Sequence, residues 1–142
     1  MIAVDTNILV YWHRADSQFH SKAKTVMEGL RNSSDSWAIP WPCIHEFIGI
    51  VTHPKIYFQP TTLSVAFATI DSWLAGGRLQ LLSEGETYFG KLRELATTAK
   101  IGGPRIHDAR IAAICLAHGV SEFWSYDRDF RGFPTLTVKN PL

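Results

Sequence analysis

Short apolar runs alternate with helical segments along the whole chain, and this alternation limits the fold more than any other feature. Strand-length apolar runs occupy residues 2–4, 37–39, 79–82, 123–125 and 136–138. Helical segments are expected over residues 8–12, 19–30, 42–51, 88–99 and 106–118, and between Thr62 and Gly76. Such alternation favours a parallel sheet with helices on both faces, so we expect an α/β fold.

Proline and glycine mark the expected ends of several elements. Pro40 is expected to end the second strand, and Pro42 suits the first turn of the helix that follows. The run Gly102-Gly103-Pro104 separates the last two helices, and Gly119 follows the last one as a C-terminal cap. These signals fix where the chain turns between layers.

The chain length, 142 residues, is that of one ordinary domain, so we expect residues 1–142 to fold as a single unit. Hydrophobic residues make up 46% of the chain and charged residues 19%, which excludes an intrinsically disordered protein. Cys43 and Cys115 lie in apolar stretches, and their spacing fits neither a disulfide scaffold nor a zinc site. We expect both to be buried, unreactive thiols.

The N-terminal sequence and the hydropathy pattern predict a cytoplasmic protein with no membrane partner. Asp5 stands where a signal peptide would carry basic residues followed by a long apolar run. No window approaches the roughly 18 uninterrupted apolar residues of a membrane span. Glu46 and Asp71 interrupt the most apolar segments.

Four acidic residues stand beside apolar sequence at or near the ends of predicted elements: Asp5, Glu46, Asp108 and Asp127. No local motif joins them, because they are separated by 41 (46 − 5), 62 (108 − 46) and 19 (127 − 108) positions. Taken singly, each could be a turn residue or a charge at a helix N-terminus. Parallel sheets collect the carboxyl ends of their strands at one edge, however, where ligands bind. The fold can therefore gather the four acids.

Glu46 is the most informative of these acids, because its neighbours Cys43, Ile44 and Phe47 are apolar. We expect a buried Glu46 carboxylate that requires a cation. Clustered carboxylates raise one another's pKa, and a divalent cation reverses this effect. Hard oxygen ligands suit Mg²⁺, with Mn²⁺ as a substitute. Hydrolysis of a phosphodiester bond is the chemistry that such a site supports best.

Several other sites are excluded by spacing. His45-Glu46 does not belong to the metalloprotease motif H-E-x-x-H, because position 49 is Gly49. The glycine-rich signatures of nucleotide-binding proteins are also missing from the sequence. The five tryptophans are expected to fill the core or an interface.

The chain resembles a PIN domain, and specifically the VapC toxins of toxin–antitoxin modules. The resemblance rests on residues 4–9 (Val-Asp-Thr-Asn-Ile-Leu), Glu46, residues 107–112 (His-Asp-Ala-Arg-Ile-Ala) and residues 124–130 (Trp-Ser-Tyr-Asp-Arg-Asp-Phe). These motifs occur in the family order over nearly the whole chain. The resemblance implies a Mg²⁺-dependent ribonuclease with a three-layer α/β/α fold around a central parallel sheet. It also implies a homodimer and a VapB-type antitoxin partner.

The resemblance assigns roles to individual residues. Asp5, Glu46, Asp108 and Asp127 match the acidic quartet that binds metal and activates water, and Asp5 and Asp108 match direct ligands. Thr6 and Asn7 match the first motif, where their side chains are expected to hold Asp5 in place. Ser125 stands where the family usually has threonine, and its hydroxyl is expected to keep that role.

Asp127 and Asp129 compete for the last position of the quartet. We expect Asp127 to face the metal, because it follows a strand at the edge of the sheet where Asp5 also lies. Asp129 is expected instead to cap the short segment that ends at Phe133.

The basic residues predict a surface for RNA. The chain has 14 basic and 13 acidic residues. With the quartet set aside, nine acids remain (13 − 4), which leaves an excess of five positive charges (14 − 9) on the rest of the molecule. Arg105, Arg110 and Arg128 lie near the site in sequence and are the candidate phosphate contacts.

Two other functions remain open from the sequence. A phosphatase with an aspartate nucleophile would carry a second acid two residues after Asp5, but that position is Asn7. A catalytically inactive PIN-like protein that only binds RNA or an antitoxin would not need the intact quartet. Chelator-sensitive cleavage of RNA distinguishes the ribonuclease from both.

Overall fold

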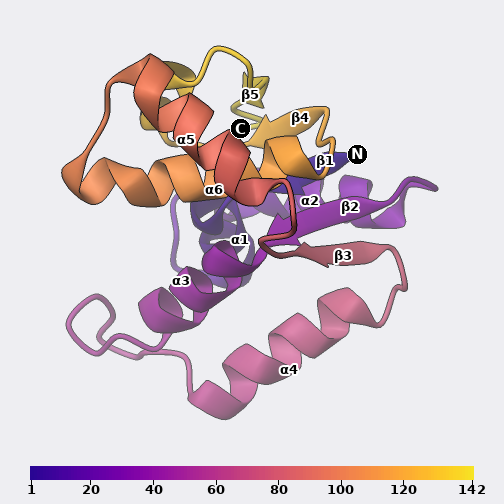
Figure 1. The fold of residues 1–142 in the computed structure, drawn as a ribbon. Coiled ribbons are helices and arrows are strands. Elements are labelled where there is room, and N and C mark those ends of the chain that lie inside the picture. The colour runs from indigo at the N-terminus through magenta and orange to yellow at the C-terminus, as the bar shows by residue number, and fades with distance from the viewer.

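A computed structural model describes all 142 residues and contains one five-stranded parallel sheet (Figure 1). Its strands are β1 (Ile2–Val4), β2 (Trp37–Pro40), β3 (Leu79–Leu82), β4 (Glu122–Trp124) and β5 (Val138–Lys139). They lie in the order β3-β2-β1-β4-β5, and each neighbouring pair is parallel. The first strand is therefore central, with Ala3 paired to Ala38 on one side and to Phe123 on the other.

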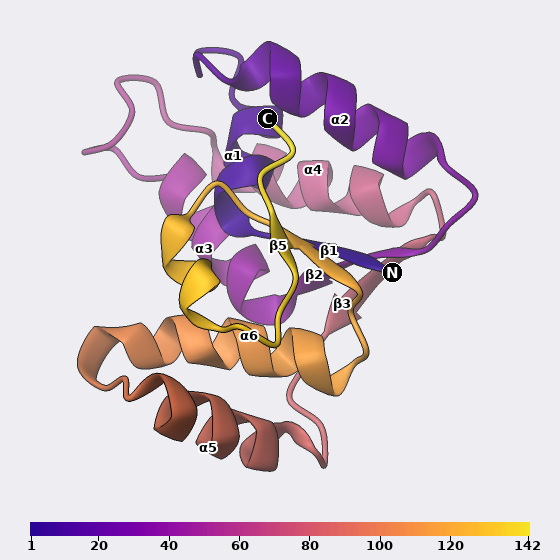
Figure 2. The ribbon, with the colours of Figure 1, turned by 90° about the horizontal axis from the view of Figure 1, so that it is seen from above.

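Helices cover both faces of the sheet. They are α1 (Thr6–His13), α2 (His20–Asn32), α3 (Trp41–Val51), α4 (Leu63–Leu74), α5 (Tyr88–Ala99) and α6 (Ile106–Ala117). Two short 3₁₀ helices, η1 (Gly103–Arg105) and η2 (Arg128–Gly132), flank the last helix and the fourth strand. Figure 2 shows α5 and α6 together on one face, with α1, α2 and α4 on the opposite side. The expected three-layer α/β/α fold with a central parallel sheet is confirmed.

Most element boundaries follow the local signals in the sequence. Pro42 lies in the first turn of α3, and Thr62 caps α4 by accepting a hydrogen bond from the Val65 N–H at 3.3 Å. His118 is the C-cap of α6, and Gly119 after it adopts a φ of 69°, a conformation that favours glycine. The helices consequently end where the chain must turn back toward the sheet.

Three strands differ from their predicted bounds. Strand β4 runs from Glu122 to Trp124, although residues 123–125 were expected. Strand β2 includes Pro40, whereas the strand was expected to stop before this residue. The last strand is Val138–Lys139, although residues 136–138 were expected. Leu136 is buried, so its apolar character reflects packing in the core and not a place in the ladder.

The core is one continuous cluster of 32 buried hydrophobic residues between the sheet and its helices. Helix α6 contributes an unbroken buried run from residues 111 to 115, because it is packed between the sheet and α5. Trp12 and Trp73 stack at 5.2 Å between ring centroids, as expected for tryptophans in the core. Cys43 and Cys115 are buried free thiols, which was also expected. None of the helices is long and apolar enough to cross a membrane.

Candidate active site

Asp5 lies at the carboxyl end of the central strand and begins helix α1. Its Oδ1 accepts the backbone N–H of Thr6 at 2.8 Å, and its Oδ2 accepts the Ser125 hydroxyl at 2.6 Å. The Cys43 thiol donates a third, longer hydrogen bond to Oδ1 at 3.5 Å. Only 4% of the Asp5 surface is exposed. The carboxylate is therefore held by donors from three separate segments of the chain.

Burial raises the pKa of Asp5 from 3.8 to about 6. Removal of the carboxylate from water is the largest cause, and the nearby Glu46 charge raises the pKa further. The hydrogen bonds from Ser125, Thr6 and Cys43 act in the opposite direction but do not balance the burial. The surroundings of Asp5 therefore disfavour its charged form, and a nearby cation would favour it.

Glu46 lies on helix α3 and faces the same region. Its Oε2 accepts the Thr6 hydroxyl at 2.8 Å, a contact that links α3 to the start of α1. The expectation that Glu46 is buried was wrong, because the side chain is exposed. The apolar neighbours Cys43, Ile44 and Phe47 point into the core, while the helical period turns Glu46 outward.

Asp108 is half-buried in the first turn of helix α6. Partial burial is the largest cause that raises its pKa, followed by the negative charges of Asp127 and Asp129. Glu46 adds a smaller effect of the same sign. Acids from two other segments of the chain therefore disfavour the charged form of Asp108.

Asp127 follows β4 and begins η2. Its backbone N–H donates to the Ser125 hydroxyl at 2.9 Å, and its Oδ1 accepts the N–H of Asp129 at 2.9 Å. The prediction that Asp129 caps the short segment was wrong: Asp127 is the cap. An exposed Asp127 thus has both a structural hydrogen bond and a place near the other acids.

One cavity of about 170 Å³ brings the four acids together. Its lining comprises Asp5, Thr6, Asn7, Glu46, Ile50, Asp108, Ile111, Asp127 and Phe130. Asp127 is among these residues and Asp129 is not. Carboxylates separated by up to 122 positions (127 − 5) therefore share one cavity, and the position of the strand ends predicts this for Asp5 and Asp127.

The hydrogen bonds around Asp5 differ in part from those expected. Ser125 does hold the carboxylate, but the side chains of Thr6 and Asn7 do not. The Thr6 hydroxyl is bonded to Glu46, and the Asn7 Oδ1 accepts the backbone N–H of Tyr126 at 3.3 Å. Asn7 consequently anchors the segment that carries Asp127.

The contact between Cys43 and Asp5 was not predicted from the sequence. Cys43 lies one helical turn before Glu46, and that spacing is the signal that could have placed it near the acids.

The three candidate arginines lie in different environments. Arg110 forms an ion pair with Glu84, with 2.6 Å between Nε and Oε1. Arg105 donates through Nη2 to the Asp129 carbonyl at 3.1 Å and packs against Gly132. Arg128 makes no hydrogen bond or ion pair and lines a small second cavity beside the acids. Of the three, Arg128 alone has an uncommitted guanidinium.

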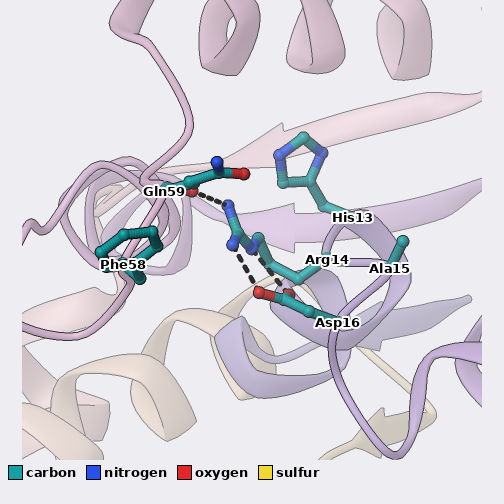
Figure 3. Close-up of a pocket in the computed structure, with 6 residues that line it drawn as sticks. All are labelled: His13, Arg14, Ala15, Asp16, Phe58 and Gln59. Carbon is teal, nitrogen blue, oxygen red and sulfur yellow. Dashed lines mark hydrogen bonds and ion pairs between the residues drawn. The ribbon is translucent and has the colours of Figure 1, made fainter.

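A larger cavity of about 430 Å³ lies elsewhere, at the end of helix α1 (Figure 3). It contains none of the quartet. The guanidinium of Arg14 donates two hydrogen bonds to the Asp16 carboxylate, from Nε and Nη2, and a third from Nη1 to the Gln59 carbonyl at 3.0 Å. The charge of Arg14 is therefore neutralised within the cavity, which offers no reactive group comparable to the acidic cluster.

Comparison with known families agrees with the geometry of the acidic cavity. Residues 2–135 match the PIN domain. The chain belongs to the PIN domain family. This PIN domain is also similar to curated VapC proteins over its full length. Ribonuclease VapC43 of Mycobacterium tuberculosis is 33% identical over 142 residues, which cover 100% of this chain and 96% of that protein. Ribonuclease VapC48 of the same species is 29% identical over 97% of this chain and 95% of its own length.

Solved structures show the same fold. VapBC2 from Rickettsia felis, bound to a promoter DNA fragment, matches with a TM-score of 0.71 and 21% identity over 99% of this chain and 98% of that chain. VapC20 of Mycobacterium tuberculosis, a toxin that cleaves the sarcin–ricin loop, matches with a TM-score of 0.67 and 16% identity over 92% and 93%. The resemblance read from the sequence motifs is thereby confirmed.

Replacing Asp127 should separate its two contributions. In Asp127→Ala we expect slower RNA cleavage and a loss of about 1 kcal/mol in the free energy of unfolding, because the η2 cap is removed. Asp127→Asn should lose cleavage but keep the cap, since asparagine caps as well as aspartate. Denaturant unfolding and cleavage assays on both variants test this. Asp129→Ala is the matched control, and a cleavage defect confined to that variant would contradict the assignment.

Proposed function

We propose that this PIN domain is a Mg²⁺-dependent endoribonuclease toxin of a VapBC module, with Mn²⁺ as a substitute ion. Membership among the VapC ribonucleases supplies the reaction class. The observation that carries the proposal is the convergence of Asp5, Glu46, Asp108 and Asp127 on one cavity. A phosphatase with an aspartate nucleophile has no support from the comparisons.

The residues of the cavity fit a hard divalent cation. Asp5 and Asp108 would be its direct ligands, with Glu46 and Asp127 completing the acidic lining. A carboxylate offers about four lone-pair sites, and three donors occupy those of Asp5, so one site remains for an ion. No three acidic, histidine or cysteine side chains form a preassembled ligand cluster. This fits Mg²⁺, which binds through one or two carboxylates and takes its other ligands from water and substrate phosphate.

The ion, when bound, would offset the phosphate charge and increase the acidity of the attacking water. The chain's own side chains supply the remaining requirements. Ser125 and the Thr6 N–H fix the orientation of Asp5, and the Thr6 hydroxyl holds Glu46 through one oxygen. The other oxygen of Glu46 makes no hydrogen bond, and we propose that it accepts the proton released by the attacking water.

Removal of divalent metal should abolish cleavage and lower stability. We expect EDTA to stop RNA cleavage and added Mg²⁺ to restore it. At an ion concentration of 100 times its dissociation constant, the free energy of unfolding should rise by about 2.7 kcal/mol. Cleavage assays and thermal unfolding, with and without Mg²⁺, measure both effects. Full cleavage in EDTA contradicts the metal mechanism, whereas Mg²⁺ binding without cleavage supports the inactive binding protein.

The partner in this proposal is a VapB-type antitoxin, which would bind in the cytoplasm to a homodimer of this chain. Support comes from the fold shared with VapBC2 from Rickettsia felis. We expect the antitoxin to insert an arginine into the acidic cavity, because a planar guanidinium can bridge two carboxylates. Replacing that arginine with alanine should weaken inhibition of cleavage. Full inhibition through contacts wholly away from Asp5, Glu46 and Asp108 would contradict this expectation.

A further inference from the structure

A second cavity, of about 120 Å³, adjoins the acidic one. Two of its seven lining residues are hydrophobic, and its charged residues are Asp127, Arg128 and Arg131. Asp127 also lines the acidic cavity, so one residue separates a region of four carboxylates from a region with a net positive charge. The volume suits a small charged group, since sites for drug-sized ligands measure about 300–1,000 Å³.

The polar groups of this cavity are available to a ligand. The exposed side chains of Arg128 and Arg131 make no hydrogen bond and no ion pair. Asn140 also lines the cavity, and its Oδ1 accepts the Leu142 N–H at 3.0 Å, so its amide N–H groups remain free to donate. Arg14 in the larger cavity differs, because Asp16 already neutralises its guanidinium. Arg128, Arg131 and the Asn140 amide thus offer unpaired donors in this cavity, where the Asp127 carboxylate is the single negative charge.

The backbone that carries the two arginines is held in place. Asn7 accepts the Tyr126 N–H, Ser125 accepts the Asp127 N–H, and Asp127 accepts the Asp129 N–H. The Tyr126 ring packs against Phe19 at 4.9 Å between centroids. Little ordering of the main chain is thus required when a ligand binds, which favours affinity.

We propose that Arg128, Arg131 and Asn140 form a subsite for a phosphate of the RNA strand next to the one that is cleaved. This inference rests on the proposed ribonuclease function. The arginine cavity begins at Asp127, where the acidic cavity ends, so an RNA strand that leaves the acidic cavity on this side brings its neighbouring phosphate to the arginines. Arginine forks bind phosphate oxygens in pairs, and the Asn140 amide adds a neutral donor. The subsite fixes the strand relative to the acids without reading a base.

Binding of RNA by full-length variants tests the subsite. All variants carry Asp5→Asn so that the RNA stays intact, and the probe is a labelled single-stranded RNA that the unmodified chain cleaves. Arg128→Ala/Arg131→Ala should weaken binding about tenfold or more. The slope of log K against log salt should fall by about 0.7 for one lost phosphate contact. Arg31→Ala/Arg93→Ala removes the same charge from residues outside the cavities and should bind as the parent does.

A neutral linkage in the RNA locates the contact. A single methylphosphonate placed beside the cleavage site should weaken binding to the parent but leave binding to the double variant unchanged. Equal binding by parent and double variant overturns the subsite alone, as does an equal loss in the control. Loss of antitoxin binding with unchanged RNA binding assigns the arginines to the antitoxin and also overturns it. If the Asp5→Asn parent binds no RNA, the proposed function fails together with the subsite.

Discussion

Replacing Asp5 or Asp108 with asparagine should abolish RNA cleavage and leave the protein folded. Each change preserves the shape of the side chain and removes one negative charge from the cavity that the four acids share. We expect a loss of about a thousandfold or more in the cleavage rate, because electrostatic stabilisation of the transition state is commonly the largest contribution to catalysis. Cleavage of RNA at matched Mg²⁺ concentrations measures the effect.

The two variants should retain their fold for different reasons. Asparagine can still cap α1 at position 5, and it removes a buried charge whose pKa is raised to about 6. At position 108 the side chain is half-buried and makes no hydrogen bond that asparagine would break. Asp71→Asn, an exposed acid on α4 outside the cavity, is the matched control and should cleave normally. Near-parental cleavage by Asp5→Asn or Asp108→Asn would remove that residue from the site.

The fold could be predicted largely from local signals. Several helix ends could be predicted because the residue type there suits the local backbone. Examples are Pro42 in the first turn of α3, Thr62 as the N-cap of α4, and Gly119 with its positive φ after α6. The last strand was harder, because Leu136 is apolar for reasons of core packing. In so short a segment, a residue buried in the core and a residue of a buried strand are both apolar, so the sequence does not distinguish them.

The candidate site was predictable in its membership and not in its hydrogen bonds. The carboxyl ends of β1 and β4 place Asp5 and Asp127 at one edge of the sheet, and helices α3 and α6 bring Glu46 and Asp108 to the same cavity. The partner of each hydroxyl depends on side-chain directions that only the packed helices determine. Thr6 therefore binds Glu46 across 40 positions (46 − 6), a contact without a sequence signal. Asp127 and Asp129 have similar local surroundings, and the turn at η2 decides that Asp127 is the cap.

The exposure of Glu46 has a physical consequence for the site. A carboxylate with access to water needs no cation to remain charged, so Glu46 does not by itself indicate a metal, contrary to the argument from its apolar neighbours. The burial of Asp5, and not that of Glu46, is the reason to expect a cation. The raised pKa of Asp5 shows that the cavity disfavours the charged form of this carboxyl when no cation is nearby.

Asp5 should make the metal-free protein less stable as the pH rises from about 4 to about 6. The pKa of this carboxyl is about 6 in the folded protein and 3.8 ordinarily. The folded state therefore holds a proton that the unfolded state has lost, and its favourable contribution is complete below pH 3.8 and disappears as the pH passes 6. A difference of about two pKa units corresponds to about 3 kcal/mol in the free energy of unfolding.

Denaturant unfolding in EDTA between pH 4 and pH 7 measures this dependence, with Asp5→Asn as the reference. Asp108 also has a raised pKa, so the difference between the two proteins is what isolates Asp5. The variant should be the more stable protein at pH 7, and its profile should be flatter between pH 4 and pH 6. Saturating Mg²⁺ should flatten the profile of the parent as well, because a bound cation favours the charged carboxylate. Parallel profiles for parent and variant in EDTA would mean that burial at Asp5 does not oppose its ionisation, and the electrostatic reason for a cation in this cavity would be lost.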